Sequence, residues 1–350
     1  MHGSDPNFVP PFPGSIRKFL AKDSSFQRQH GRIEAFLAHR DGKVVGRIAA
    51  IFNHTSNTYQ NESVGHFGFF ACEDRQETAN ELFAVAEEAF RREGYTAGRG
   101  PYNPSIHDDC GVLVNGFDTP PMISMPHNPP HYDRLVQACG YVPRRELGAF
   151  IITAEARCPP RFRPILERTR RASNLKLRDI DLNNLDKELD AICQIYNQTL
   201  DRNWGFYPLT VDDLKDSADD MRFFADPRMM IFVEIDGEVQ AFGIMLPNIF
   251  EFLRKSRGRK GLLRTLEVAL RIKTGHPEDA RLAILGVRPK YRDRALGALV
   301  YCEMFVRAHQ LGYKRVETSW IDEDNEDILR AISLMGCTKY KGYRLYEKLL

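Results

Sequence analysis

Apolar and polar residues along the chain follow a pattern that occurs twice. Ile33–His39 and Val44–Phe52 are rich in β-branched and aromatic residues and are joined through Asp41-Gly42, which predicts an antiparallel hairpin. The same pattern returns later in the chain: Met230–Ile235, Asp236-Gly237 and Val239–Leu246. The two predicted turns lie 195 residues apart, from Asp41 to Asp236.

Each predicted hairpin is followed by a strand and an amphipathic helix. In the first half, the strand Val64–Phe70 leads to a helix over Glu77–Glu93, in which apolar residues recur at helical spacing. In the second half, the strand Leu282–Val287 leads to a helix over Ala298–Gln310. The same order of elements is therefore predicted in both halves.

The ends of the two halves also correspond. Gly140 and Gly336 lie 196 residues apart, and each follows a predicted short helix and precedes an extended tail. Two nearly equal separations around one order of elements predict a duplicated domain. We expect an N-terminal domain at residues 1–153, a basic, proline-containing linker at 154–173 and a C-terminal domain at 174–350.

The composition is that of a globular protein without membrane spans. Of the 350 residues, 43% are apolar and 27% are charged, and the net charge is only +2, so any electrostatic signal is local. No apolar run approaches the roughly 18 to 20 residues that a membrane-spanning helix requires. Seven dispersed cysteines without a C-x-x-C pair favour reduced thiols. These features predict a cytoplasmic protein.

The segment Leu282–Val300 predicts an anion-binding site. A strand end, an arginine-rich loop and a helix start present several backbone N–H groups and a positive helix end to one anion. Arg292 and Arg294 add positive charge, and Gly297 allows the backbone to approach a ligand closely. This pattern is typical of a diphosphate-binding turn and predicts a coenzyme-dependent transferase; the alternative is an ordinary turn with surface arginines. The predicted coenzyme-binding residues here are Leu285, Gly286, Val287, Arg292, Arg294, Ala295, Leu296, Gly297 and Ala298.

The segment Arg281–Leu350 resembles the acetyl-CoA-binding half of the GNAT acyltransferase superfamily. The resemblance rests on Tyr291-Arg-Asp-Arg-Ala-Leu-Gly-Ala-Leu299, on Asn325 after a strand and on the turn at Gly336. It implies an α/β fold of the mixed α+β type, with two tandem domains whose mostly antiparallel sheet is flanked by helices. In the superfamily, loop amides and an arginine hold the coenzyme A pyrophosphate, and a splay between the fourth and fifth strands admits the pantetheine arm. The resemblance implies that Asn325 either holds the loop or bonds the pantetheine.

Over its whole length, the chain resembles the tandem bacterial ceramide synthase-like N-acyltransferases. The segments that carry this resemblance are Asp5–Pro11, Val45–Ala50, Gly65–Phe70, Gly100–Ser105, Asn115–Pro121 and Met125–Pro130. It implies an N-acyltransferase that takes acyl-CoA or acetyl-CoA as donor, without a metal, and an amine as acceptor, with a sphingoid-type lipid amine as one candidate. The alternatives are a catalytically inactive acyl-CoA or lipid-binding scaffold and an aminoacyl or small-molecule acetyltransferase.

The chain departs from the superfamily pattern at three places. Leu299 stands where glycine or alanine is usual, and we expect it to pack without blocking the site. Ile332 stands where many members carry a general-acid tyrosine, and isoleucine cannot donate a proton. The first half lacks the Arg-x-x-Gly loop between Phe70 and Leu82, and the acidic residues there would repel a diphosphate. We therefore expect the first half to be a substrate-binding or structural half.

Catalytic candidates follow from the chemistry of acyl transfer. Transfer to an amine needs orientation, a route for the amine proton and polarisation of the thioester carbonyl. Glu317 and Ser319 are two residues apart on a predicted strand near the splay, so they face the same side. Tyr340 and Tyr343 are candidates to replace the missing acid. We predict Glu317, Ser319 and Tyr343 as catalytic residues, the alternative for each being an ordinary strand residue.

The acceptor candidates lie in an aromatic segment and beside a basic insertion. The segment Asn203–Pro208 supplies Trp204 and Tyr207, and Asn248 immediately precedes the insertion at residues 249–280. Within that insertion, residues 250–273 contain eight basic and two acidic residues, together with apolar residues. Two interpretations stand: a helix that contacts an anionic membrane surface peripherally, or a helix that caps the domain with a solvated basic face.

No motif predicts a metal or a nucleic acid. His127 and His131 are separated by Pro129-Pro130, which forbids the helix that would align them, and His107–Cys110 is too compact for a usual zinc site. No basic stripe is interleaved with aromatic residues. We expect a small-molecule or lipid amine as partner, no nucleic acid and no metal, and no motif specifies an oligomeric state.

Overall fold

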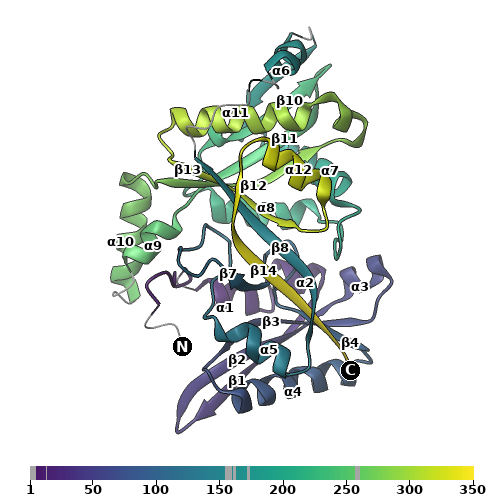
Figure 1. Cartoon of the computed structure of the whole chain (residues 1–350), viewed down its shortest axis with the longest axis vertical. Coiled ribbons are helices and arrows are strands. Elements are labelled where there is room, and N and C mark those ends of the chain that lie inside the picture. Colours follow the sequence, from purple (N-terminus) through teal and green to yellow (C-terminus); the bar gives the residue numbers. More distant parts are fainter. Residues whose placement is uncertain (1–4, 13, 154–159, 161–162, 172–173, 257–260) are drawn as a thin grey trace.

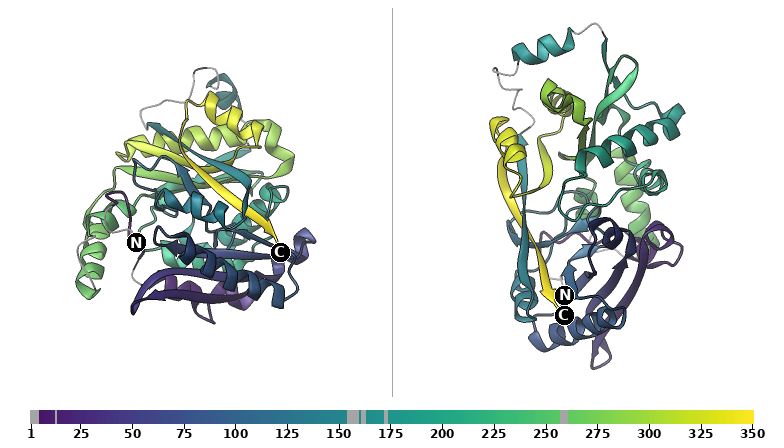
Figure 2. Two further views of the ribbon diagram at one scale, coloured as in Figure 1. Left: turned by 60° about the horizontal axis from the view of Figure 1, so that its bottom comes forward. Right: turned by 90° about the vertical axis from the view of Figure 1, so that its right-hand side faces the viewer.

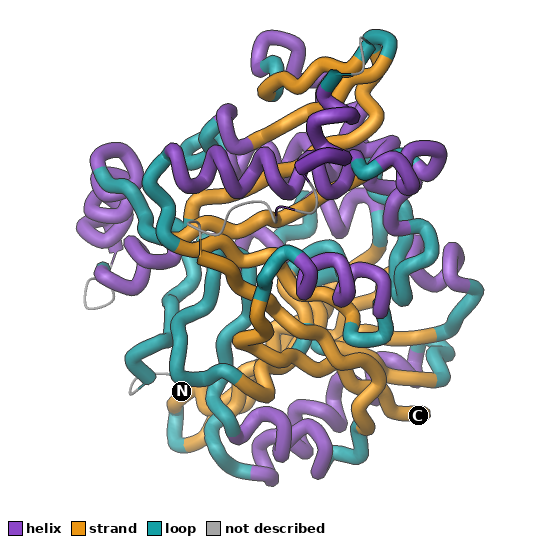
Figure 3. The backbone as a smooth tube through the Cα atoms, turned by 45° about the horizontal axis from the view of Figure 1, so that its top comes forward, coloured by secondary structure: helices purple, strands orange, loops and turns teal. Residues whose placement is uncertain are grey.

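Helices flank a sheet that runs through the whole molecule (Figures 1 and 3). The computed structural model describes residues 5–12, 14–153, 160, 163–171, 174–256 and 261–350, so residues 154–159, 161–162 and 172–173 of the predicted linker at 154–173 lie outside it. The elements of the first half are α1 (Ser15–Leu20), α2 (Ser25–Gln29), β1 (Gly31–Arg40), β2 (Lys43–Asn53), α3 (His54–Gln60), β3 (Val64–Cys72), α4 (Gln76–Arg92), β4 (Ala97–Gly100), β5 (Tyr102–Asn103), β6 (Asp109–Cys110), β7 (Val112–Asn115), α5 (His131–Ala138) and β8 (Val142–Thr153).

The second half repeats the order of strands and helices. Its elements are α6 (Arg163–Arg170), β9 (Leu175–Asp179), η2 (Leu182–Asn184), α7 (Leu185–Leu200), α8 (Val211–Met221), η3 (Pro227–Met229), β10 (Met230–Ile235), β11 (Glu238–Pro247), α9 (Phe250–Lys255), α10 (Gly261–Thr274), β12 (Asp279–Val287), η4 (Pro289–Arg294), α11 (Leu296–Gln310), β13 (Arg315–Asp322), α12 (Glu326–Leu334) and β14 (Thr338–Leu349).

The two predicted hairpins are confirmed. β1 pairs with β2 and β10 pairs with β11, both antiparallel. Asp41 and Gly42 have φ of 49° and 71°, and Asp236 and Gly237 have φ of 55° and 79°. Positive φ at both central residues is the type I′ geometry, whose twist matches that of the flanking strands.

The two halves exchange their last strands. The sheet order is β1-β2-β3-β4-β14-β8-β13-β12-β11-β10-β9, with β7 pairing with β14 beside this path. β8, the last strand of the first half, pairs with β13, whereas β14, the last strand of the chain, pairs with β4. β8 and β14 also pair with each other and run side by side between the halves (Figure 2, right). Each half therefore supplies a strand that the sheet of the other half needs, and the predicted domain boundaries remain a prediction.

Helices cover both faces of the second half of the sheet. α11 packs against β10, β11 and β12 on one face, and α7 packs against β11 and β12 on the other. Successive strand residues divide between the two cores: Ile231 and Val233 join the α11 core, and Phe232 joins the α7 core. In the first half, α4 packs on β1, β2 and β3. The predicted mixed α/β fold with a mostly antiparallel sheet is confirmed.

Two further expectations from composition meet the structure. Among the described residues, no helix is long and apolar enough to cross a membrane. Free thiols are found at Cys72, Cys110, Cys139, Cys193 and Cys337.

Candidate active site

β12 and β13 pair only at their first residues and then diverge. Asp279–Arg281 pairs in parallel with Arg315–Glu317, and no pairing between the two strands follows in the described chain. Ala283 is bulged out of the β11–β12 ladder, and the β13–β8 ladder shifts between Glu317 and Trp320. Ser319, inside that shift, has a φ of 67°. These irregularities hold the strands apart, which confirms the predicted splay in the sheet.

The start of α11 lies just past the end of β12. Ala295 precedes the helix in the left-handed conformation, with a φ of 58°, and no side chain caps the helix start. The first intrahelical bond runs from Leu299 N to Ala295 O at 2.9 Å. By helix geometry, the N–H groups of Leu296, Gly297 and Ala298 have no intrahelical acceptor, so they are available to an anion.

Gly297 leaves room at this helix start. A Cβ built on it would lie 3.7 Å from Val287 Cγ2 and 3.9 Å from Leu285 Cδ2, which are ordinary contacts. The protein itself therefore tolerates a side chain here, and any requirement for glycine comes from a ligand. Leu285, Val287 and Gly297 meet at one place, as the sequence predicts.

Arg292 is engaged by the neighbouring helix. Its Nη2 donates to the carbonyl oxygens of Gln198 at 2.9 Å and Thr199 at 3.2 Å, in the last turn of α7. A cation is favourable at a helix C-terminus. Arg292 thus ties α7 to the loop before α11, while the side chain of Arg294 lies outside the described part of the structure.

A buried polar cluster lies where the strands diverge. Glu317 has no exposed surface, and its Oε2 accepts a hydrogen bond from the Tyr340 hydroxyl. Arg281 Nε lies 3.4 Å from Glu317 Oε1 and donates to Ser319 Oγ at 2.8 Å. Nη1 of the same guanidinium donates to the carbonyl oxygens of Ile123 at 2.7 Å and Ser124 at 2.9 Å, and Nη2 donates to Ser319 Oγ at 2.5 Å.

The charges in this cluster are strongly perturbed. Burial raises the pKa of Glu317, and the opposing positive charge of Arg281 is the largest influence that lowers it. Burial, followed by the negative charge of Glu317, raises the pKa of Tyr340. A carboxylate that gains proton affinity in this way is a better proton acceptor than an exposed one.

The structure brings the predicted catalytic residues together. Glu317 and Ser319 both contact Arg281, and Tyr343 is fully buried beside Glu317, Arg281 and Asp109. The Tyr343 hydroxyl has no hydrogen-bond partner among the described residues. Arg281 was missed by the sequence predictions. An arginine that directly precedes the apolar run Leu282–Val287, in the same strand, is nevertheless a signal of a buried ion pair.

A cavity of about 240 Å³ has Tyr340 in its lining. Asn248, Ile151 and Tyr340 line it together with the ion-paired Asp279 and Arg315, whose closest approach is 2.6 Å. Tyr340 therefore belongs both to the cavity lining and, through its hydroxyl, to the cluster around Glu317. The buried Asn248 Oδ1 has no partner among the described residues.

The predicted acceptor residues fall into three places. Asn248 lines the cavity beside Tyr340. Trp204 is half-buried and packs against the cluster that contains Tyr343, with Arg99 4.8 Å and Arg145 5.3 Å from its ring centroid. Tyr207 is buried elsewhere, where its carbonyl oxygen accepts a hydrogen bond from His107 Nε2 at 2.9 Å. The structure therefore does not gather Trp204, Tyr207 and Asn248 into one pocket.

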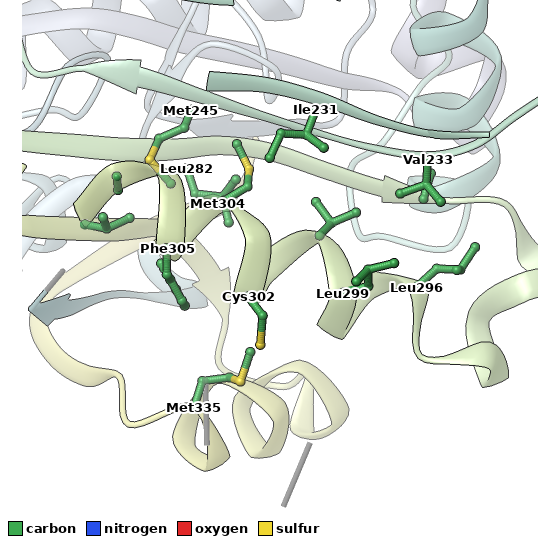
Figure 4. Close-up of a cluster of buried hydrophobic side chains, with 14 of the residues drawn as sticks. Ile231, Val233, Met245, Leu282, Leu296, Leu299, Cys302, Met304, Phe305 and Met335 are labelled. Atoms are coloured by element: carbon green, nitrogen blue, oxygen red, sulfur yellow. The ribbon is translucent and has the colours of Figure 1, made fainter. Parts of the chain in front are cut away.

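Three residues have structural roles that bear on the predictions. Leu299 and Ile332 are buried in the core around α11, so Leu299 packs as expected and neither faces the splay (Figure 4). Asn325 Oδ1 accepts a hydrogen bond from Ile328 N at 3.2 Å and thereby caps α12. This bond favours the loop-holding role of Asn325.

The equivalent splay in the first half is filled by the chain itself. β3 and β4 pair only over Val64–His66 and Ala97–Arg99. Beyond this point, a Cβ on Gly68 would lie 1.6 Å from the Tyr102 carbonyl oxygen, and Phe69 N donates to Asn103 Oδ1 at 2.5 Å. No pantetheine arm can enter here without displacing Tyr102 and Asn103.

These features define the class of the protein. Each half contains a pair of parallel strands that diverge, and in the second half they diverge beside the uncapped start of α11. Among solved structures, the chain is similar to a tandem GNAT protein from the clavulanic acid biosynthesis pathway, with a TM-score of 0.57 and 13% identity over 99% of this chain and 90% of that one. It is also similar to a GCN5-related N-acetyltransferase from Sphaerobacter thermophilus, with a TM-score of 0.51 and 13% identity over 90% of this chain and 80% of that one. The fold is that of the tandem GNAT proteins.

Sequence comparison narrows the class. No family model matches the chain. The chain is 32% identical to the bacterial ceramide synthase of Caulobacter vibrioides over 355 residues, covering 100% of this chain and 92% of the relative. It is 28% identical to Protein YghO of Escherichia coli K12, covering 99% of this chain and 90% of the relative. The chain belongs to the family of the bacterial ceramide synthase, and it is an acyltransferase.

Proposed function

We propose that the protein is an acyl-CoA-dependent N-acyltransferase with one coenzyme site, in the second half. The observation that carries the proposal is the juxtaposition of the uncapped start of α11 with the buried cluster of Arg281, Glu317, Ser319 and Tyr340 at one splay. Backbone N–H groups at the helix start suit a diphosphate, and the cluster supplies a proton acceptor. The filled splay of the first half supports a structural or acceptor-binding role for that half.

The proposed reaction is the attack of an amine nitrogen on the acyl thioester carbon. The N–C bond forms, the C–S bond breaks and coenzyme A leaves as the thiolate. Glu317 accepts the proton that the amine loses, and the hydroxyl of Tyr340 or Tyr343 donates a proton to the thiolate. The tyrosine is restored by the proton that Glu317 accepted, so the reaction is balanced without a metal, and the described residues contain no group of His, Cys, Asp and Glu able to hold one.

The proposed acceptor is a lipid amine. The relative from Caulobacter vibrioides is named a ceramide synthase, and a ceramide is an N-acylated lipid amine. In this chain, the cavity beside Asn248 is lined by Tyr340, whose hydroxyl bonds Glu317, so an amine bound there would lie next to the residue that contacts the carboxylate. The proposal includes a cytoplasmic location with peripheral membrane contact through residues 250–273.

The test is a thiol-release assay with acetyl- to palmitoyl-CoA and a set of lipid and water-soluble amines, together with thermal shift. Glu317→Gln is expected to lower kcat by about 100-fold or more, since a positioned proton acceptor raises the rate about 10²- to 10⁴-fold. The coenzyme Kd should change less than about threefold. Glu323→Gln, a carboxylate paired with Lys339 near the surface, is the matched control and should keep full turnover.

Two results would overturn the proposal. Stabilisation by acyl-CoA without thiol release for any amine would assign the protein to coenzyme binding alone. No stabilisation by any acyl-CoA would remove the coenzyme site at α11.

A further inference from the structure

α10 turns its apolar residues to solvent. Leu262, Leu263, Leu266 and Leu270 are 74%, 71%, 58% and 61% exposed. Residues 262, 266 and 270 are four apart, so they lie along one side of the helix. α10 lies at the edge of the molecule, away from the central sheet (Figure 1; Figure 2, left).

The other side of α10 is attached to the protein by polar and apolar contacts. Arg264 donates to the carbonyl oxygens of Pro10 at 3.0 Å and Pro11 at 3.2 Å. Val268 is buried and Ile272 packs against the apolar cluster of Ile249 and Phe252, whereas Arg271 pairs with Glu267 within the helix at 2.9 Å. A surface helix normally buries its apolar side and exposes its charges. α10 packs Val268 and Ile272 inward but also exposes four leucines on its other side, so a capping helix whose solvated face is basic does not describe it.

The leucines lie within a strongly basic part of the sequence. Residues 250–273 carry eight basic side chains and two acidic ones. Lys255 at the end of α9 and Lys273 at the end of α10 are exposed. An apolar face flanked by cations matches the surface of an anionic bilayer, where acyl chains take up the leucines and headgroups attract the cations.

We propose that α10 docks the protein on an anionic membrane by inserting Leu262, Leu263, Leu266 and Leu270 into the lipid interface. α9, which packs against α10, supplies Phe250, Arg254 and Lys255 to the wall of the cavity beside Tyr340. Docking therefore brings this cavity close to the bilayer, where a lipid amine enters it. The substrate route rests on the proposed N-acyl transfer, whereas docking itself does not.

The experiment is flotation of the full chain with phosphatidylcholine vesicles made with and without phosphatidylglycerol. We expect binding to the phosphatidylglycerol vesicles only, weakened at high salt because the surface attraction is screened. Leu266→Ser with Leu270→Ser should lower the partition coefficient about tenfold or more, because two leucines leave the apolar phase. Leu37→Ser, at a leucine on β1 that is 58% exposed, is the matched control and should bind normally.

A thiol-release assay with a water-soluble amine and no vesicles separates docking from catalysis. The double variant should keep its turnover in that assay, and it should fold, since both leucines are exposed. Absence of binding to either vesicle overturns docking even where thiol release is intact. Unchanged binding of the double variant, or concentration-dependent self-association that the double variant abolishes, reassigns the leucine face and also overturns the proposal.

Discussion

Replacing Arg281 by methionine tests whether one buried cation holds the cluster around Glu317. Arg281 is 7% exposed, and it donates to Ser319 Oγ and to the carbonyl oxygens of Ile123 and Ser124. Methionine keeps much of the aliphatic volume but has no donor and no charge. The substitution therefore leaves Glu317 without its ion-pair partner and two carbonyl oxygens without donors.

The expected loss of stability is large and depends on pH. Removing one partner of a buried ion pair costs about 3–5 kcal/mol, and we expect the free energy of unfolding to fall by this amount near pH 8. Burial raises the pKa of Glu317 above its unfolded value, and Arg281 opposes that rise. Without Arg281 the folded state holds the Glu317 proton more tightly. The free energy of unfolding therefore falls as the pH rises above the pKa of Glu317 in the unfolded state, and it is partly regained toward pH 5. The loss should therefore be smaller at pH 5 than at pH 8.

Urea unfolding followed by tryptophan fluorescence measures this change, because Trp320 adjoins Ser319 and the chain has only two tryptophans. Arg75→Met is the control: Arg75 and Glu77 form a 3.7 Å pair with side chains 54% and 76% exposed, and its loss should change stability by about 0.5 kcal/mol or less. Adding Glu317→Gln to Arg281→Met should recover at least about 1 kcal/mol. A loss below about 1 kcal/mol, or one that is equal at pH 5 and pH 8, refutes the reasoning.

Three further predictions concern the helix start, the filled splay and the contact between halves. Gly297→Ala should leave the melting temperature unchanged or higher, since its Cβ fits, yet weaken coenzyme A binding about tenfold by calorimetry; unchanged affinity would contradict the anion site. The Cβ of Gly68→Ala would lie 1.6 Å from the Tyr102 carbonyl oxygen, so this variant should lower the free energy of unfolding by about 3 kcal/mol or more. An unfolding curve equal to that of the native protein would show that the splay is not filled. Although burial opposes it, hydrogen bonds from His30 and Thr210 lower the pKa of Asp213 to about 2. The stability that Asp213 adds is therefore full above its unfolded pKa of about 3.9 and lost as pH falls toward 2, so the difference between the native protein and Asp213→Asn should shrink over that range in acid unfolding.

Local chemistry explains what the sequence revealed. The Asp-Gly turns predicted both hairpins because few residues accept positive φ at two successive positions. The arginine-rich loop and Gly297 located the start of α11 beside β12, because a strand end followed by a helix start is specified by adjacent residues. The spacing of Glu317 and Ser319 also placed both beside one partner, although that partner was not predicted.

Arg281 shows why part of the site was not predicted, and Tyr340, a predicted candidate acid, shows that its partner was not predicted either. They reach Glu317 from β12 and β14, and the pairing of these strands with their neighbours depends on contacts between segments far apart in the chain. The acceptor set shows the same limit: Trp204 and Tyr207 are close in sequence, yet one packs near Tyr343 and the other bonds His107.

The sequence by itself determined the repeated order of strands and helices, the two hairpins and the helix start after β12, since each depends on neighbouring residues and backbone geometry. Only the tertiary structure decided which strands complete which half, because β8 pairs with β13, β14 pairs with β4 and both pair with each other through segments far apart in the chain. It also decided that Tyr102 and Asn103 fill the first splay and that the leucines of α10 face outward. Those outcomes depend on close approach of distant segments, which no local pattern encodes.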